Sequence, residues 1–165
     1  MRPCYRLIRA MPLQPVRIPC VRAVVQRVGE ASVVVDEKVV ARSGRGLLVL
    51  LGVAAGDGVA GAEKLAGRVA RLRIFENAGG RLDRSLLDIG GEALVVSQFT
   101  LIADANKGNR PSFGHAAPPE QAEPVYRRFC EELERLGVSV ERGTFGARMQ
   151  VSLVNDGPVT IVLDT

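Results

Sequence analysis

The hydrophobic positions of this chain alternate with polar ones over much of its first third, a period of two that predicts β-strands. Asp36 and Glu37 separate two such runs and predict a tight turn. Strand-like runs, the last two of them β-branched and largely alternating, cover residues 22–28, 31–35, 38–42, 47–53, 93–98, 138–141, 149–154 and 159–163.

Two other stretches repeat their hydrophobic residues at helical spacing. Asp57 is a candidate N-cap for the first, in which Leu65 and Val69 share one face. The second helix is expected over about residues 119–136, and Gly137 ends it. Two helices among many strands, with few strand–helix–strand repeats, predict an α+β fold. We expect a curved, mostly antiparallel β-sheet or barrel covered by about two helices.

The segment Asn155-Asp156-Gly157-Pro158-Val159-Thr160 lies between the last two predicted strands, so we expect it to form the corner between them. Glycine gives the backbone freedom, while proline lacks an N–H group and fixes φ. The Gly157-Pro158 pair can therefore present carbonyl groups outward, which would suit a site built from main chain. For an isolated Gly-Pro pair, an ordinary hairpin turn is the simpler interpretation.

The composition limits both the size of the core and the charge of the surface. The chain has 165 residues, 47% of them hydrophobic, which is enough for one buried core and short for two. Aromatic residues make up only 4% and Trp is absent, so the chain cannot form an extensive stacking platform for nucleic-acid bases. Four of the 22 basic residues lie in residues 1–20, which contain no acidic residue. The other 18 balance 18 acidic residues, so residues 21–165 carry no general polyanion-binding field.

Residues 1–20 contain four prolines and show no sustained periodicity. We expect them to be an extension outside a single domain of residues 21–165. A flexible basic tail, an Arg-rich transit peptide and a misplaced start with Val21 as the true first residue are the three interpretations. Scarce hydroxyl residues weaken the transit peptide. The misplaced start is favoured, because Val can reflect an alternative initiation codon.

The cysteines and the longest apolar run exclude several protein classes. Three cysteines, an odd number, predict neither a disulfide framework nor a metal site. Cys130 falls on the apolar face of the second helix and is expected to be a buried structural thiol. The longest apolar stretch, residues 46–56, is about half the length of a membrane helix. We expect a soluble, cytoplasmic protein without a metal, a cofactor or a membrane contact.

The usual sets of catalytic side chains are poorly represented. His115 is the only histidine, in a long polar loop over residues 103–118. Ser112 could pair with it, but a plain loop histidine is the simpler interpretation. Neighbouring carboxylates such as Glu131 and Glu132 are better explained as solvated charge.

Residues 97–101 place polar groups where a predicted strand ends. Ser97 and Thr100 provide hydroxyls, Gln98 provides an amide, and backbone N–H groups there can stabilise an oxyanion. Phe99 adds an apolar or stacking surface. Taken alone, the segment is explained equally well as an ordinary strand end.

Together, Ser97-Gln98-Phe99-Thr100-Leu101 and Asn155-Asp156-Gly157-Pro158-Val159-Thr160 closely resemble the two signature motifs of the D-aminoacyl-tRNA deacylases. The resemblance runs in register from Val21 to the C-terminus. It includes residues 22–28, 72–75, 107–113 and 145–149. Family members begin with Met directly before this Arg-Ala-Val-Val-Gln-Arg-Val segment, so Val21 takes the place of the initiator. The first 20 residues depart from the pattern and are not expected to be needed for activity.

The resemblance implies an ester hydrolase that proofreads in translation. Its substrates would be D-aminoacyl-tRNA and Gly-tRNA, cleaved at the ester to the 3′-terminal adenosine. An aminoacyl ester is already activated, so its hydrolysis needs positioning, an oriented water and oxyanion donors more than a strong nucleophile.

The resemblance also implies a homodimer in which Gly157-Pro158, joined by a cis peptide bond, enters the active site of the partner subunit. The two carbonyl groups would hold the amino group of the substrate and leave no room for an L side chain.

By the same resemblance, the catalytic residues are Ser97, Gln98 and Thr100, which would line the scissile ester. Thr100 has no neighbouring base in the sequence to activate it, so a positioning role is favoured over a nucleophilic one. The ribose 2′-hydroxyl would then help to activate the attacking water.

The other implied site residues contact the substrate without reacting. The substrate-binding residues are Phe99, Met149, Asn155, Gly157 and Pro158. Phe99 and Met149 would border the terminal adenine, although composition alone favours a core methionine at Met149. Asn155 would shape its loop, although an ordinary turn former explains it equally well. Lys107 and Arg110 would meet acceptor-stem phosphates, although a solvated loop explains them as well.

Two other functions stay open. One is a non-catalytic RNA-binding homodimer with the same fold, and intact copies of both motifs argue against it. The other is a relative that acts mainly on achiral or L-aminoacyl substrates, and the D-specific pattern of both motifs argues against that.

Overall fold

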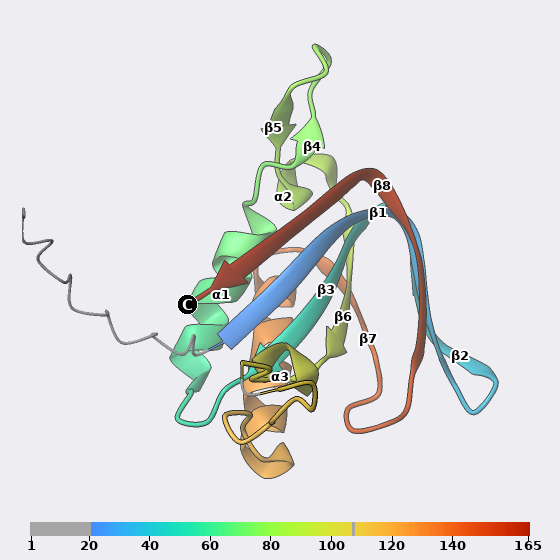
Figure 1. Cartoon of the computed structure of the whole chain (residues 1–165). Helices are drawn as coiled ribbons and strands as arrows, with labels where there is room; N and C mark the ends of the chain where they lie inside the picture. Colours follow the sequence, from blue (N-terminus) through green and yellow to red (C-terminus); the bar gives the residue numbers. More distant parts are fainter. Residues whose placement is uncertain (1–20, 107) are drawn as a thin grey trace, which may run out of the picture.

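The computed structural model describes residues 21–106 and 108–165, which form the expected α+β fold (Figure 1). The expectations for residues 1–20 and for Lys107 lie outside the described residues. In chain order, the elements are β1 (Val21–Val35), β2 (Lys38–Ser43), β3 (Gly46–Val53), α1 (Val59–Ala70), β4 (Phe75–Glu76), β5 (Leu82–Arg84), α2 (Leu86–Ile89), β6 (Glu92–Ser97), the 3₁₀ helix η1 (Phe99–Ile102), α3 (Pro119–Arg135), β7 (Ser139–Arg142) and β8 (Gln150–Asp164).

The main sheet is mixed and strongly curved, nearly closed like a barrel (Figure 1). β1 runs antiparallel to β2, β3 and β8. β6 runs parallel to both β3 and β7, so the sheet is less uniformly antiparallel than the sequence suggested. Parallel neighbours need long crossover connections, and here these are the segments that carry α1 and α3.

The central strands are buried on both faces, because the helices cover one face and the curve of the sheet encloses the other. Val49 of β3 and Val95 of β6 pack in the core shared with α1 and α3. Leu48 and Leu94 belong to a second core, together with the inward residues of β1 and β8. Burial on both faces explains the nearly continuous apolar run in β3.

Two pairs of predicted strands are single strands in the structure. Residues 22–28 and 31–35 are both part of β1, and residues 150–154 and 159–163 are both part of β8. The predicted corner over residues 155–160 is therefore wrong. Both halves of β8 pair with β1 in the same direction, and the register jumps between them, so residues 156–159 form a bulge. Gly and Pro mark bulges as well as turns, so the sequence pattern could not separate the two.

Helical periodicity located both long helices, with one error at a cap. Gly58, and not Asp57, is the N-cap of α1. The single-turn helix α2 was not predicted, and a reciprocal capping box between Ser85 and Asp88 begins it. No helix in the described part of the chain has the length and apolar character needed to cross a membrane.

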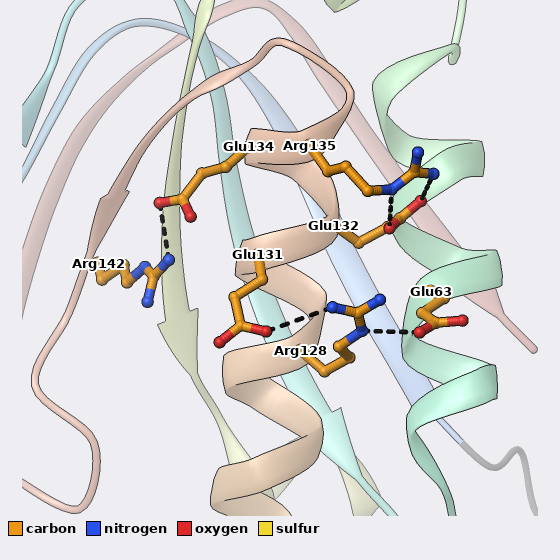
Figure 2. A network of polar contacts seen from close by, with 7 residues as sticks. All are labelled: Glu63, Arg128, Glu131, Glu132, Glu134, Arg135 and Arg142. Carbon is orange, nitrogen blue, oxygen red and sulfur yellow. Dashed lines mark hydrogen bonds and ion pairs between the residues drawn. The ribbon is translucent and has the colours of Figure 1, made fainter.

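Ion pairs connect α3 to its neighbours (Figure 2). Arg128 Nε lies 2.7 Å from Glu63 Oε1 of α1, and Arg128 also pairs with Glu131. Glu132 accepts two hydrogen bonds from Arg135, which lower the pKa of its carboxyl group. The two neighbouring glutamates thus each pair with an arginine of α3 and do not form a catalytic pair. Ion pairs as exposed as Arg128–Glu63 each stabilise a fold by only about 0–1 kcal/mol.

Candidate functional site

A cavity of about 620 Å³ opens where the carboxyl ends of β3 and β6 meet the start of α3. These two strands are parallel neighbours, so the residues that follow them lie at one edge of the sheet. Residues 116–119 and 145–147 form further walls. The cavity brings together four of the predicted site residues, namely Ser97, Gln98, Phe99 and Met149.

The polar side of the cavity is the point where β6 ends. The Gln98 N–H group donates to the carbonyl of Leu51, at 2.8 Å, and the chain then turns into η1. The first N–H groups of a helix have no carbonyl partner within it, and η1 begins at this edge of the cavity. The Gln98 side-chain amide donates to the Thr100 hydroxyl. Thr100 is exposed beside the cavity and does not line it.

Two aromatic rings lie at the cavity with much of their surface exposed. Phe99 is 57% exposed and Phe113 is 39% exposed, which is unusual for such large apolar side chains. Their ring centroids are 5.1 Å apart in an edge-to-face arrangement. Phe113 was not predicted as a site residue. Its signal was an aromatic residue within a loop otherwise rich in Gly, Pro and Asn.

The inner wall of the cavity is apolar. Met149 and Phe145 line it beside Tyr126 of α3. Among the described lining residues, Tyr126 alone has an ionisable side chain, and burial raises the pKa of its hydroxyl. His115 is exposed in its loop and does not line the cavity. The described wall therefore provides hydroxyls, an amide and apolar surface, and no strong base.

A buried arginine holds the bulge of residues 156–159 in place through contacts with Asp156. Arg27 of β1 is 5% exposed. Its Nε donates to the carbonyl of Asp156, at 2.8 Å, and its Nη1 donates to the carbonyl of Ile74, also at 2.8 Å. The Asp156 carboxylate lies 3.3 Å from the same guanidinium group. Sequence reasoning missed Arg27, which looked like one more polar position in an alternating strand.

Asn155 stabilises the bulge through two side-chain hydrogen bonds. Its Oδ1 accepts from the N–H group of Val159 at 3.0 Å, and its Nδ2 donates to the Thr160 hydroxyl at 3.1 Å. Both bonds cross the bulge, so the expectation that Asn155 shapes this segment agrees with the geometry. Its expected contact with substrate stays a prediction.

The bulge is exposed and lies outside the cavity. Gly157 and Pro158 are exposed, the peptide bond between them is cis, and neither residue lines the cavity of its own chain. β8 pairs only with β1 among the described strands, so the bulge lies on an edge strand. Within one chain, the two motifs do not form one site.

The remaining predicted residues lie apart from the cavity. Arg110 is exposed in the loop and does not line it, and Lys107 is outside the described residues. Within residues 21–106 and 108–165, no three His, Cys, Asp or Glu side chains gather as a group that could hold a metal ion. Cys130 is fully buried, as expected for a structural thiol, and burial raises its pKa to about 11.

Comparisons with known proteins agree on one family. The family model described as D-Tyr-tRNA(Tyr) deacylase matches residues 24–164. A protein of Roseiflexus castenholzii named D-aminoacyl-tRNA deacylase is 64% identical over 87% of this chain and 92% of its own. A protein of Thermomicrobium roseum with the same name is 60% identical over 87% of this chain and 94% of its own.

Solved structures agree with the fold. The structure of a protein named c-Myc DNA Unwinding Element Binding Protein superposes with a TM-score of 0.83 and 44% identity, covering 87% of this chain and 98% of that one. A structure described as a probable eukaryotic D-amino acid tRNA deacylase superposes with a TM-score of 0.77, covering 88% of this chain and 99% of that one. Its identity is 21%, so it supports the fold alone.

Proposed function

The chain belongs to the D-aminoacyl-tRNA deacylase family, hydrolases that act on ester bonds, and from this premise we propose that it cleaves the ester between a D-amino acid and the 3′-terminal adenosine of tRNA. Glycine attached to tRNA is a second substrate, because a site that excludes side chains of one hand cannot exclude an achiral residue. The step removes misacylated tRNA before it is used in translation.

The observation that carries this proposal is a cavity with a polar edge, an aromatic mouth and no strong base among its described lining residues. The terminal adenine stacks at Phe99 and Phe113, while Met149 borders it inside. The ester then lies against Ser97 and Gln98, with Thr100 beside them outside the cavity lining. Water adds to the carbonyl carbon, the bond to the ribose oxygen breaks, and that oxygen leaves as the 3′-hydroxyl with a proton.

The side chains at the ester position the substrate and do not attack it. The Gln98 amide and the N–H groups at the start of η1 stabilise the oxyanion. Thr100 accepts a hydrogen bond from Gln98, so it orients that amide. The neighbouring ribose 2′-hydroxyl helps to activate the water.

Gly157-Pro158 completes the site of the partner subunit in a homodimer. An exposed bulge on an edge strand, held rigidly by Arg27 and Asn155, supports this role. Val154 and Val162 of the same strand are 55% and 58% exposed, which provides apolar surface for a second copy. The carbonyls of Gly157 and Pro158 hold the amino group of the substrate and exclude L side chains.

The test is to incubate the purified chain with D-Tyr-tRNA and with L-Tyr-tRNA and to follow release of the amino acid. We expect rapid release from the D ester and no release from the L ester above the rate without protein. Equal rates with both esters, or none with either, would overturn the proposal. The non-catalytic RNA-binding alternative predicts binding without turnover, and relatives named as deacylases at 60–64% identity do not favour it.

A further inference from the structure

Two elements that carry the cavity wall donate hydrogen bonds to one buried carbonyl group, that of Val95. Val95 of β6 is fully buried, and its oxygen accepts two hydrogen bonds. Tyr126 Oη donates one at 2.9 Å from α3, and the N–H group of Gly143 donates the other at 2.9 Å from the end of β7. The carbonyl precedes Ser97 by two residues. It therefore joins the polar edge of the cavity to the two elements that carry the rest of the wall.

Tyr126 has a polar role beyond filling space. Its side chain is 5% exposed, and a buried hydroxyl needs a hydrogen-bond partner, which Val95 supplies. The ring lies 5.8 Å from the ring of Phe145, centroid to centroid, so the residue touches both sides of the cavity. Removing the hydroxyl would keep this ring contact, release the Val95 carbonyl near the end of β6, and remove a side-chain hydrogen bond with Cys130.

Gly143 acts on the opposite wall. A Cβ atom at this position would lie 2.8 Å from Met149 Sδ and 3.5 Å from Val96 Cγ2, closer to the sulfur than real Cβ atoms come. The missing side chain is therefore what lets Met149 lie against β6, where it lines the cavity.

We propose that Tyr126 and Gly143 are positioning residues of the deacylase site, acting through the shared Val95 carbonyl and through Met149. Tyr126 fixes the end of β6 and so the groups at the ester, whereas Gly143 fixes the Met149 wall against the adenine. This inference rests on the proposed function.

Substitutions at Tyr126 and at Gly143 are expected to change different kinetic constants for the hydrolysis of D-Tyr-tRNA. Tyr126→Phe lowers kcat about tenfold and leaves KM nearly unchanged, because small displacements of reacting groups slow chemistry more than binding. Gly143→Ala raises KM about fivefold with little change in kcat, because the displaced sulfur narrows the stacking site. Steady-state kinetics on the full chain measure both.

Matched variants separate positioning from a general loss of stability. Phe129→Leu alters a fully buried ring on the same helix that does not line the cavity, and Gly61→Ala adds a methyl group at ordinary contact distances elsewhere. Both keep wild-type kcat and KM after correction for the folded fraction. If the Tyr126 and Gly143 variants behave like these controls while the wild type is active, the inference is wrong. An inactive wild type would instead overturn the proposed function, and this inference with it.

Discussion

The two motif segments differ in where the fold places them and in what holds them. Ser97 and Gln98 end a strand that is buried on both faces, and they line the cavity of their own chain. Gly157 and Pro158 lie on an edge strand, exposed and outside that cavity, yet a buried arginine and an asparagine fix their backbone. A rigid, exposed segment is suited to contact something outside the chain. This contrast supports the proposal that one subunit supplies the cavity and another supplies the bulge.

The largest effects should come from damaging either segment. Gln98→Ala removes the proposed oxyanion donor and should lower kcat at least about 100-fold. Gly157→Ala should lower it as much, because Gly157 has φ +133° and a Cβ there would lie 2.8 Å from Val159 Cγ2 and 2.9 Å from Arg27 Nη2. Release of D-Tyr from tRNA measures both.

Mixing the two inactive variants tests whether one site combines residues of both subunits. If the cavity and the bulge of one site come from different subunits, each mixed dimer contains one intact site. Random pairing of co-expressed chains should then restore about a quarter of wild-type activity. Co-expressed copies of one variant with different tags are the control and should stay inactive. No recovery in a verified mixed dimer would mean that each site uses a single chain.

Arg27→Lys should have the next largest effect, and it should act through the bulge. Lysine keeps the charge but cannot reach both the Asp156 and the Ile74 carbonyls, so we expect a loss of about 2–3 kcal/mol in the free energy of unfolding, together with lower activity. Arg22→Lys is the matched control, because Arg22 lies on the same strand in a partly exposed pair with Asp164. That control should lose less than about 1 kcal/mol, measured by urea unfolding. Equal losses in both variants would contradict a special role for Arg27.

Sequence reasoning located the elements better than it located their connections. Alternation located β1, although as two strands, a nearly continuous apolar run located β3, and helical spacing located α1 and α3, because burial in the core imposes these patterns on the chain. The β8 bulge looked like a hairpin corner, since only the pairing partner shows that both halves run beside β1. The parallel pairing of β6 with β3 and β7 depends on where the crossover segments bring the chain back to the sheet, and no local sequence pattern indicates that position.

Contacts between residues distant in the sequence also limited the prediction of the site residues. Ser97 and Gln98 stood out as polar residues at the end of a buried strand, but only the resemblance of both motifs to a known family assigned them to a site. Phe113 had a signal that was not used, an aromatic ring in a polar loop. Arg27 and Tyr126 could not be predicted, since each owes its role to contacts with residues distant in the sequence. A buried arginine in an alternating strand looks like any other polar position until the acceptors beneath it are known.

Phe99→Ala should have a smaller effect, confined to binding at the cavity. The ring is mostly exposed, so its loss should change the free energy of unfolding by less than about 0.5 kcal/mol. The loss of stacking on the adenine should raise KM about tenfold, because base–aromatic stacking contributes about 1–3 kcal/mol. Leu82→Ala, an equally exposed apolar residue on β5, is the control and should leave KM unchanged. A Phe99→Ala variant with wild-type KM would place the adenine elsewhere.

The smallest effect should come from Cys130, which lies in the core behind the cavity and should influence stability but not catalysis. Burial raises the pKa of this thiol from 9.0 to about 11, so the folded chain keeps the proton after the unfolded chain has lost it. The stabilisation that the protonated thiol contributes is therefore fully present below about pH 9 and is lost as the pH rises toward 11. The resulting loss in the free energy of unfolding is about 1 kcal/mol at pH 10. Tyr126 acts in the same direction, because its pKa is also raised.

Urea unfolding measures this effect between pH 8 and pH 10. The free energy of unfolding should decline with pH in both proteins, and less steeply in Cys130→Ala than in the wild type. An unchanged decline, or a change in kcat/KM at neutral pH, would mean that the thiol is not the inert core group that its burial indicates.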